Sequence, residues 1–272
     1  MSKTIFPEGV DAPGRAKISV RTLRIDNWRK APIWTFLGLT AFVVYATARV
    51  ATQSAYFAEG PGYSYLTPFA SPCVSANCVE GSSHFGVWFG TFPMFVPLAI
   101  VTLTFILLFR LTCYYYRKAY YRAFWMSPSA CAVPEPKTKY TGETRFPLTM
   151  QNAHRYFWMA TVLVSLINTY DAVKSFHGTS GFGLGLGNII IVVNVILLWS
   201  YTMGCHSCRH ITLGRINHFS KHPVRYWLYQ QASRLNLKHM QLAWTTLGTL
   251  CFTDAYIALV SSGTISDLRF FG

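Results

Sequence analysis

The sequence predicts an all-α integral membrane protein with five transmembrane helices in a bundle, its N-terminus in the cytoplasm and its C-terminus outside. Three observations lead to this fold class. Of the 272 residues, 51% are hydrophobic and only 12% are charged, whereas soluble domains carry roughly a quarter charged residues. Five predominantly apolar stretches are long enough to cross a bilayer, which takes about 20 residues. Lys and Arg gather at alternate ends of those stretches, as in membrane proteins of defined orientation.

The five predicted spans are rich in Leu, Ile, Val, Phe, Trp and Ala and lack the alternating pattern of barrel strands. They are Ala31–Thr52, Phe92–Cys113, Arg155–Ser175, Phe182–Met203 and Met240–Ser262. The first is expected to be retained in the mature protein, because its basic leader and apolar part are both longer than those of a signal peptide. The predicted organisation is a cytoplasmic N-terminal arm (1–30), a five-helix membrane domain (31–262) with inner-face loops 114–154 and 204–239 and an outer loop 53–91, and an outer C-terminal tail (263–272).

The orientation follows from the basic residues. Of the 24 Lys and Arg, seven lie in residues 1–30, eight in 110–155 and six in 204–239, while the loop 53–91 has none. Because cytoplasmic loops of membrane proteins are enriched in Lys and Arg, these three segments are assigned to the inner side. The net charge of +14 therefore reports topology, and without a recognition motif it predicts no nucleic-acid partner.

Three further features refine the prediction. Cys73 and Cys78 are close together in the outer loop, where two such thiols are expected to form a disulfide. Residues 114–125 interleave basic and aromatic side chains at helical spacing, which indicates a helix at the headgroup level and a docking surface for a soluble partner. Arg49 lies inside the first span and is expected to pair with Asp171 or Asp254, since an unpaired charge in a bilayer is costly.

Thiols and imidazoles gather at the inner ends of the predicted spans. Successive helices alternate in direction, so six side chains are expected at one depth: His154, Cys205, His206, Cys208, His210 and His239. If the fourth helix continues through this stretch, Cys205 and Cys208 share one side and His206 and His210 share another. Thiolate and imidazole are ligands of zinc, iron–sulfur clusters and haem iron, so a metal cofactor is predicted here.

Four interpretations of this cluster stay open. An iron–sulfur cluster would take Cys205, Cys208 and two of the histidines, and imidazole ligation would raise its reduction potential to suit a quinone. A haem b would need two facing histidines, such as His154 with His206 or His239. Zinc would take two cysteines and two histidines. Otherwise the cysteines are small packing residues and the histidines are interfacial.

A quinone beside this cluster would need hydrogen-bond donors and flat apolar faces. The candidate contacts are Tyr114, Trp125, Trp158, Trp199 and Arg209.

Three segments of the chain resemble the single-chain membrane anchors of actinobacterial succinate dehydrogenases: Arg117–Val133, Tyr140–Pro147 and Cys205–His210. The resemblance extends from Arg21 to Ser262. It implies a multi-pass subunit of the cell membrane that carries out no succinate chemistry itself. A flavoprotein subunit would oxidise succinate at FAD, and an iron–sulfur subunit would relay the electrons to quinone, expected to be menaquinone, at the anchor. Anchors elsewhere in the family often hold haem through histidines inside their helices. This chain has none well inside its spans, which favours a non-haem cofactor at the inner face.

The expected function is therefore that of a membrane-anchor subunit of a respiratory succinate:quinone oxidoreductase, in contact with lipid, quinone and the two soluble subunits. A cofactor-free structural anchor is the first alternative. A transporter is the second, and the absence of repeats and the few polar residues in the spans argue against it.

Overall fold

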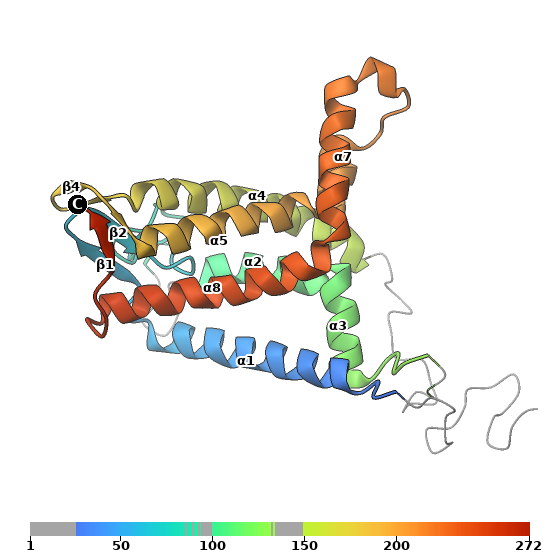
Figure 1. Cartoon of the computed structure of the whole chain (residues 1–272), viewed down its shortest axis with the longest axis horizontal. Helices are drawn as coiled ribbons and strands as arrows, with labels where there is room; N and C mark the ends of the chain where they lie inside the picture. The colour runs from blue at the N-terminus through green and yellow to red at the C-terminus, as the bar shows by residue number, and fades with distance from the viewer. Residues whose placement is uncertain are drawn as a thin grey trace, which may run out of the picture. The chain divides into compact units, whose positions relative to one another are not determined.

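The computed structural model describes residues 26–84, 86–88, 90–91, 93, 100–131, 133 and 149–272. The predictions for most of the N-terminal arm and for much of the loop between residues 132 and 148 lie outside these residues. The chain divides into two compact units, the first made of residues 1–43 and 111–152 and the second of residues 44–110 and 153–272. The described chain is mainly helical, as Figure 1 shows.

Three described helices are long and apolar enough to cross a membrane: α1 (Lys30–Thr52), α5 (Leu186–Met203) and α8 (His239–Ser261). They correspond to the first, fourth and fifth predicted spans. The second predicted span contains the 13-residue helix α2 (Ile100–Thr112), whose preceding residues 94–99 lie outside the described part. The third corresponds to α4 (Thr149–Lys174), which has 26 residues and is less apolar because its buried side carries hydroxyl, amide and imidazole groups.

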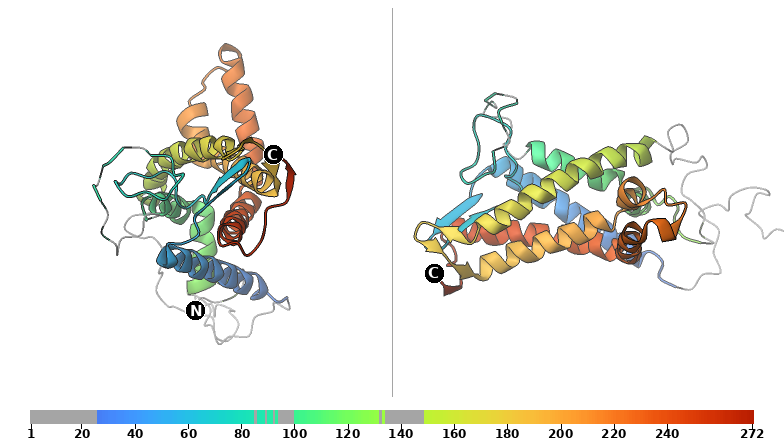
Figure 2. Two further views of the ribbon diagram at one scale, coloured as in Figure 1. Left: turned by 90° about the vertical axis from the view of Figure 1, so that its left-hand side faces the viewer. Right: turned by 90° about the horizontal axis from the view of Figure 1, so that it is seen from above.

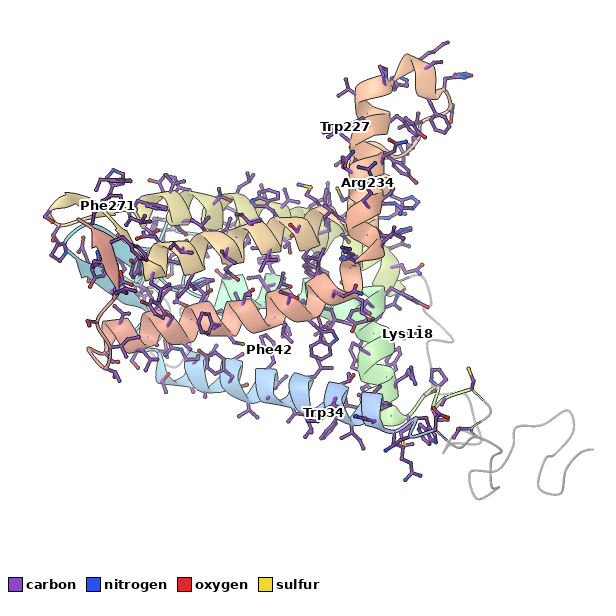
Figure 3. All side chains as sticks on the ribbon, in the orientation of Figure 1. Trp34, Phe42, Lys118, Trp227, Arg234 and Phe271 are labelled. Atoms are coloured by element: carbon purple, nitrogen blue, oxygen red, sulfur yellow. A yellow bond between two sulfur atoms is a disulfide. The ribbon has the colours of Figure 1, made fainter. Side chains whose placement is uncertain are left out.

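Helix α1 has no buried residue along its length. Trp34 is 65% exposed, and its side chain projects outward in Figure 3. In the first unit, Phe36 of α1 packs on Phe124 of α3 (Tyr114–Trp125), with ring centroids 4.8 Å apart. Helix α3 itself confirms the helix predicted for residues 114–125. Exposed aromatic and aliphatic side chains on a helix of this length suit contact with lipid or with a partner.

The second unit is built on α4, α5 and α8, which run side by side in Figures 1 and 2. Its apolar core brings α4, α5 and α8 against the hairpin of β1 (Phe57–Gly60) and β2 (Tyr63–Leu66). Two more two-stranded sheets pair β3 (His177–Gly178) with β4 (Gly181–Phe182) and β5 (Leu184–Gly185) with β6 (Arg269–Phe271). The all-α prediction missed these strands, since each has only two to four residues, and β5 and β6 pair across α5 and α8.

We call the end of the second unit that carries these sheets the strand end. The opposite end, where α5 stops at Met203, α4 reaches His154 and α8 begins at His239, is the cysteine end. From the cysteine end α7 (Pro223–Leu237) leaves at a steep angle to α5 and α8, as Figure 1 shows. The sequence pattern had not predicted this helix.

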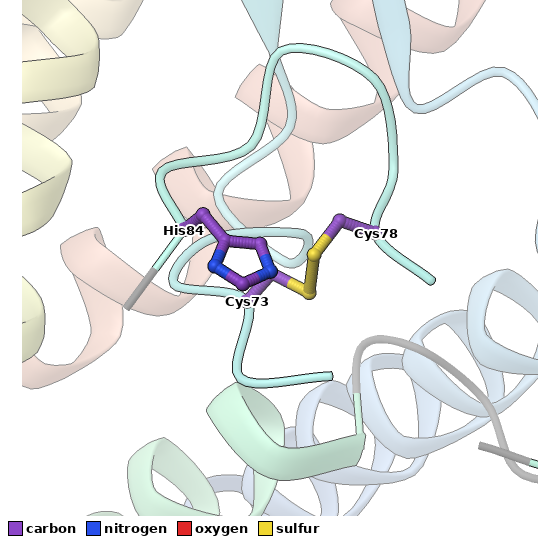
Figure 4. Close-up of side chains that lie close together, drawn as sticks. All are labelled: Cys73, Cys78 and His84. Atoms are coloured by element: carbon purple, nitrogen blue, oxygen red, sulfur yellow. A yellow bond between two sulfur atoms is a disulfide. The ribbon is translucent and has the colours of Figure 1, made fainter. Parts of the chain in front are cut away.

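A disulfide joins Cys73 and Cys78 at the strand end, as predicted. Figure 4 shows His84 beside it, with Nε2 of the ring 2.9 Å from the carbonyl oxygen of Ser75. Three ligand-type side chains lie close together here, but the S–S bond occupies both cysteines. The group is therefore a disulfide that closes a loop, with a histidine beside it.

Arg49 pairs with Asp254 of α8: Nε lies 2.6 Å from Oδ2 and Nη2 lies 3.2 Å from Oδ1. One of the two predicted pairings is thus confirmed. Asp171 instead accepts a hydrogen bond from Ser83. Tyr45 also donates to Asp254, at 2.5 Å, so the carboxylate is held by several donors.

Candidate functional site

Helix α5 ends at Met203, one turn earlier than a continuous helix through the cysteine motif requires. Cys205 is extended, with φ −69° and ψ 143°, and only the three-residue α6 (His206–Cys208) and a π-helix, η1 (Arg209–Leu213), follow. A Cβ at Gly204 would lie 2.9 Å from the carbonyl oxygen of Ser200 and 3.2 Å from Cβ of Leu235. The contact with Leu235 is tighter than an ordinary Cβ contact, so α7 packs closely against the break. The fourth predicted span likewise ended at Met203; the condition under which Cys205 and Cys208 would share one helix side, a helix continuing through the motif, is not met.

This break turns Cys205 towards α4. Its Sγ lies 3.1 Å from Nε2 of His154, and both residues are buried, with exposures of 1% and 7%. The structure therefore brings one predicted thiol and one predicted imidazole into contact inside the second unit. A soft sulfur ligand beside an imidazole is the donor combination that transition metals select.

A stack of rings positions this pair and a second histidine. The ring of His154 lies on Phe109, at a centroid distance of 4.9 Å and an interplanar angle of 4°. Phe109 meets Tyr201 edge-on at 5.5 Å, and Tyr201 stacks on His239 at 4.6 Å. The two histidines that begin α4 and α8 are thereby held at the same end of the unit, as predicted.

The other motif residues point elsewhere. Cys208 is buried, with its Sγ 3.7 Å from Sδ of Met203 and 3.6 Å from Oγ1 of Thr212. Burial raises the pKa of the Cys208 thiol, which keeps it protonated unless a metal displaces the proton. His206 and His210 are exposed and their rings lie 4.3 Å apart. Although His206 is exposed overall, partial desolvation of its ring, followed by the electrostatic effect of His210, lowers its pKa, so its imidazole is neutral and able to bind a metal.

The structure assembles these candidate ligands only in part. Within the described residues of the second unit, no third Cys, His or carboxylate ligand atom lies within 4.8 Å of both Cys205 Sγ and His154 Nε2. A four-ligand centre in this unit would therefore require side-chain rotation when the metal enters. The buried pair already supplies the thiolate and the imidazole that such a centre needs.

The predicted quinone contacts fall in both units. Tyr114 and Trp125 stand at the two ends of α3 in the first unit and are 67% and 48% exposed. In the second unit, Trp158 donates from Nε1 to the carbonyl oxygen of Thr202 at 2.9 Å. Trp199 donates to Oγ1 of Thr169 at 2.8 Å. Both indole N–H groups are thus already bonded within the protein, and the rings offer mainly flat apolar surface.

Arg209 lies at the cysteine end, where Nη1 is 3.2 Å from Oδ1 of Asn236 and the guanidinium lies over the ring of Tyr229 at 5.2 Å. Its remaining donors are available to an acceptor, since Arg carries five. Arg209 is therefore the positively charged residue among the predicted quinone contacts in the second unit, the others there being Trp158 and Trp199.

Sequence reasoning missed a buried arginine at the same end. Arg110 is 5% exposed; it donates to the carbonyl oxygen of Ala243 and to Oγ1 of Thr246, each at 3.3 Å. Its guanidinium also lies over the ring of Tyr201, at 5.2 Å. A single charge at the end of the apolar run Ile100–Thr112 was the available signal, because buried cations in membrane proteins are rare and mark functional regions.

Comparison with known proteins decides the family. The family model described as actinobacterial succinate dehydrogenase subunit SdhC matches residues 30–263. The chain belongs to this family. A chain of a solved structure described as the Mycobacterium smegmatis Sdh1 complex in the apo form is 65% identical, with a TM-score of 0.85, over 96% of this chain and 98% of that chain. No curated protein matches the sequence. As a member of the SdhC family, the chain is a membrane subunit of an actinobacterial succinate dehydrogenase and resides in the plasma membrane.

Proposed function

We propose that this subunit anchors succinate dehydrogenase to the membrane and delivers electrons from its soluble subunits to a quinone at the cytoplasmic face. The observation that carries the proposal is the buried contact between Cys205 and His154, in a chain whose family is that of the membrane subunit. The partners are a flavoprotein that oxidises succinate at FAD and an iron–sulfur subunit that relays the electrons. Succinate itself reacts in the flavoprotein.

The proposed topology has five spans, built on α1, α2, α4, α5 and α8, with the N-terminus inside and the C-terminus outside. The domain division is the one predicted from the sequence, with the cysteine end in the cytoplasmic leaflet and the strand end outside. The confinement of basic residues to alternate loops supports it. Reporter fusions at Gly81 and at Lys139 are expected to lie on opposite sides of the membrane, and finding both on one side would exclude this topology.

The cofactor proposed for the cysteine end is an iron–sulfur cluster held by Cys205 and Cys208 with His154 and a second histidine from His206, His210 and His239. The Cys205–His154 contact fits such a centre, since both donors are buried and 3.1 Å apart. When bound, such a cluster accepts and releases single electrons at a potential that imidazole ligation raises.

The protein contributes the surroundings. Burial of His154 and Cys205 excludes water from the donors, and the stack on Phe109 fixes the orientation of the imidazole. Stacking and burial limit the rotamers open to His154, which pre-orders a ligand.

The quinone is proposed to bind at the same end, and menaquinone is the expected species. Trp158 is a predicted contact there although only 4% of it is exposed, and Arg209 carries N–H donors beyond those bonded to Asn236 and Tyr229 for a quinone carbonyl oxygen. Tyr114, Trp125 and Trp199 remain predicted contacts.

Metal analysis of the purified complex tests the cofactor. Cys205→Ala and His154→Ala are expected to lower the iron content, to remove a paramagnetic signal and to stop quinone reduction, while succinate oxidation with a soluble dye acceptor persists. Cys251→Ala, a cysteine of α8 well away from the motif, is the matched control. A Cys205→Ala complex with full iron content and normal quinone reduction would contradict the proposal. A haem absorption band that disappears with His154→Ala would show that the cofactor is haem b instead of an iron–sulfur cluster.

A further inference from the structure

The buried face of α4 is polar along almost its whole length. Its buried residues include His154, Trp158, Thr161, Ser165 and Asn168, whereas apolar side chains of the same helix, such as those at positions 163 and 166, are more than half exposed. A bilayer-spanning helix that turns its polar groups inward needs partners for them, because an unsatisfied polar group away from water is costly.

At the strand end a groove lies beside α4. The groove, of about 460 Å³, is lined by Ser82, Ser83, His84, Leu166, Ile167, Tyr170 and Lys174. Ser83, in the groove, donates a hydrogen bond to Asp171 of α4. Asp171 is itself only half-buried, and its hydrogen bond to Ser83 connects its carboxylate to the solvent-exposed groove.

A second, partly enclosed pocket of about 20 Å³ is lined in part by Asp171. Its polar lining consists of Thr67, Asn168, Asp171 and Asn194, and the rest is Leu66, Pro68, Ile191 and Val195. A cavity of this size has room for about one water molecule, and several polar partners are what such a water needs. Asp171 lines this pocket and accepts a hydrogen bond from Ser83 of the groove, so it connects the two, with Lys174 and His84 on the groove side and the Arg49–Asp254 pair beyond Thr67.

The polar groups continue from this cavity towards the cysteine end. The side chain of Ser165 donates to the carbonyl oxygen of Thr161 at 2.8 Å. The hydroxyl oxygens of Thr161 and Thr202 are buried and have no hydrogen-bond partner among the described residues. Buried hydroxyls without protein partners are normally satisfied by ordered water. Thr202 also accepts from Trp158 through its carbonyl oxygen and lies three residues before Cys205.

We propose that the polar face of α4, with Asn194 and Thr202 of α5, forms a hydrated path that carries protons from the outer side to the quinone at the cysteine end. Asp171 is the entry group, and Thr161 is a relay position. From Asp171 to His154 the path would follow 17 residues of α4, about 25 Å at 1.5 Å per residue.

The inference rests on the proposed function, since it concerns protons consumed by quinone reduction. Succinate oxidation to fumarate releases two electrons and two protons at the soluble flavoprotein. Reduction of the quinone to quinol consumes two electrons and two protons at the membrane. If the second pair of protons enters along α4, the reaction takes up protons outside and releases protons inside, so an outside-acid gradient favours it.

The experiment uses the complete complex reconstituted in vesicles with its soluble subunits facing the bulk solution and a pH-sensitive dye trapped in the lumen. A naphthoquinone in the bilayer is the acceptor, and succinate is added outside. The lumen of wild-type vesicles is expected to become alkaline as succinate is oxidised. With Asp171→Asn or Thr161→Val, lumenal alkalinisation should be lost and quinone reduction should fall at least about tenfold. Succinate oxidation by a soluble dye acceptor should stay at the wild-type rate.

Thr161→Val preserves side-chain shape, and Thr245→Val on the exposed side of α8 is its matched control, expected to behave as wild type. Wild-type vesicles that reduce quinone without alkalinising the lumen would overturn the proton path and leave the proposed function intact. Lumenal alkalinisation that persists at the wild-type rate in both variants would overturn this route. A wild-type complex that oxidises succinate with the dye but never reduces quinone would refute the proposed function as well.

Discussion

Replacing Asp254 by Asn removes the charge at the centre of the strand-end network without changing side-chain shape. Asp254 is fully buried. Its Oδ2 accepts from Nε of Arg49 at 2.6 Å and from the hydroxyl of Tyr45 at 2.5 Å, while Oδ1 accepts from Nη2 of Arg49 at 3.2 Å and from Thr67. An amide presents N–H donors at one of these two positions, so two existing donors there would face a donor instead of an acceptor.

The size of the expected stability loss depends on which hydrogen bonds Arg49 keeps when Asp254 is replaced. Removing one partner of a buried ion pair costs about 3–5 kcal/mol of unfolding free energy. The side chain of Arg49 is 13% exposed and retains the carbonyl oxygens of Ser54 at 3.0 Å and Ala55 at 3.3 Å, which places the expected loss near the lower end, at about 3 kcal/mol. At about 2–4 °C per kcal/mol for a domain of this size, the midpoint of thermal unfolding should fall by roughly 6–12 °C.

Thermal unfolding of the purified complex in detergent measures this shift. Glu59→Gln, at an exposed carboxylate near the same end, is the matched control and should leave the midpoint unchanged. The double variant Arg49→Leu/Asp254→Leu should be more stable than Asp254→Asn, because no charge is then left unpaired. A midpoint for Asp254→Asn equal to that of the control would refute the assignment of this pair as a structural lock.

Three further outcomes are expected at other positions. Serine at both Cys73 and Cys78 should lower the unfolding free energy by about 2 kcal/mol, as the closure of so short a loop implies, and mass mapping of the wild type should find both cysteines protected from alkylation until reduction. Trp158→Phe removes the 2.9 Å indole donor to the carbonyl oxygen of Thr202, which keeps the N–H of Cys205 at 3.3 Å; it should cost about 1 kcal/mol in denaturant unfolding, whereas Trp34→Phe, at a 65% exposed site, should cost nothing measurable. Asn188→Leu removes a buried amide that bonds both the start of α5 and the end of α4, each at 2.8 Å; it should lower the thermal midpoint of the complex by more than Trp158→Phe, because two backbone groups lose their partner.

Much of this protein was readable from local pattern. Apolar runs of span length located α1, α5 and α8 to within a few residues, because the bilayer demands about 20 apolar residues wherever a helix crosses it. Basic and aromatic residues at helical spacing located α3. The two outer-loop cysteines, five residues apart, indicated their own bond, since few other partners were within reach. The resemblance of three segments indicated the family that the comparison then established.

Other features depended on contacts between distant parts of the chain. Arg49 had two candidate partners, and only the packing of α8 made Asp254 the nearer one. The pairing of β5 with β6 was not predicted for the same reason, because most of the second half of the chain separates the two strands.

The cysteine motif separates what the sequence predicted from what only the packing of the chain showed. Composition was enough to expect a metal-type cluster there, because thiols and imidazoles in one short segment have few other uses. Helical periodicity would have kept Cys205 and Cys208 on one side. The approach of Leu235 to Gly204 accompanies a break in the helix, and Cys205 faces His154 instead. The sequence by itself determined which chemical groups gather at this end, because helix length and direction carry them there. Only the tertiary structure decided which of them touch, because that depends on where α5 ends and on how α4 packs beside the break.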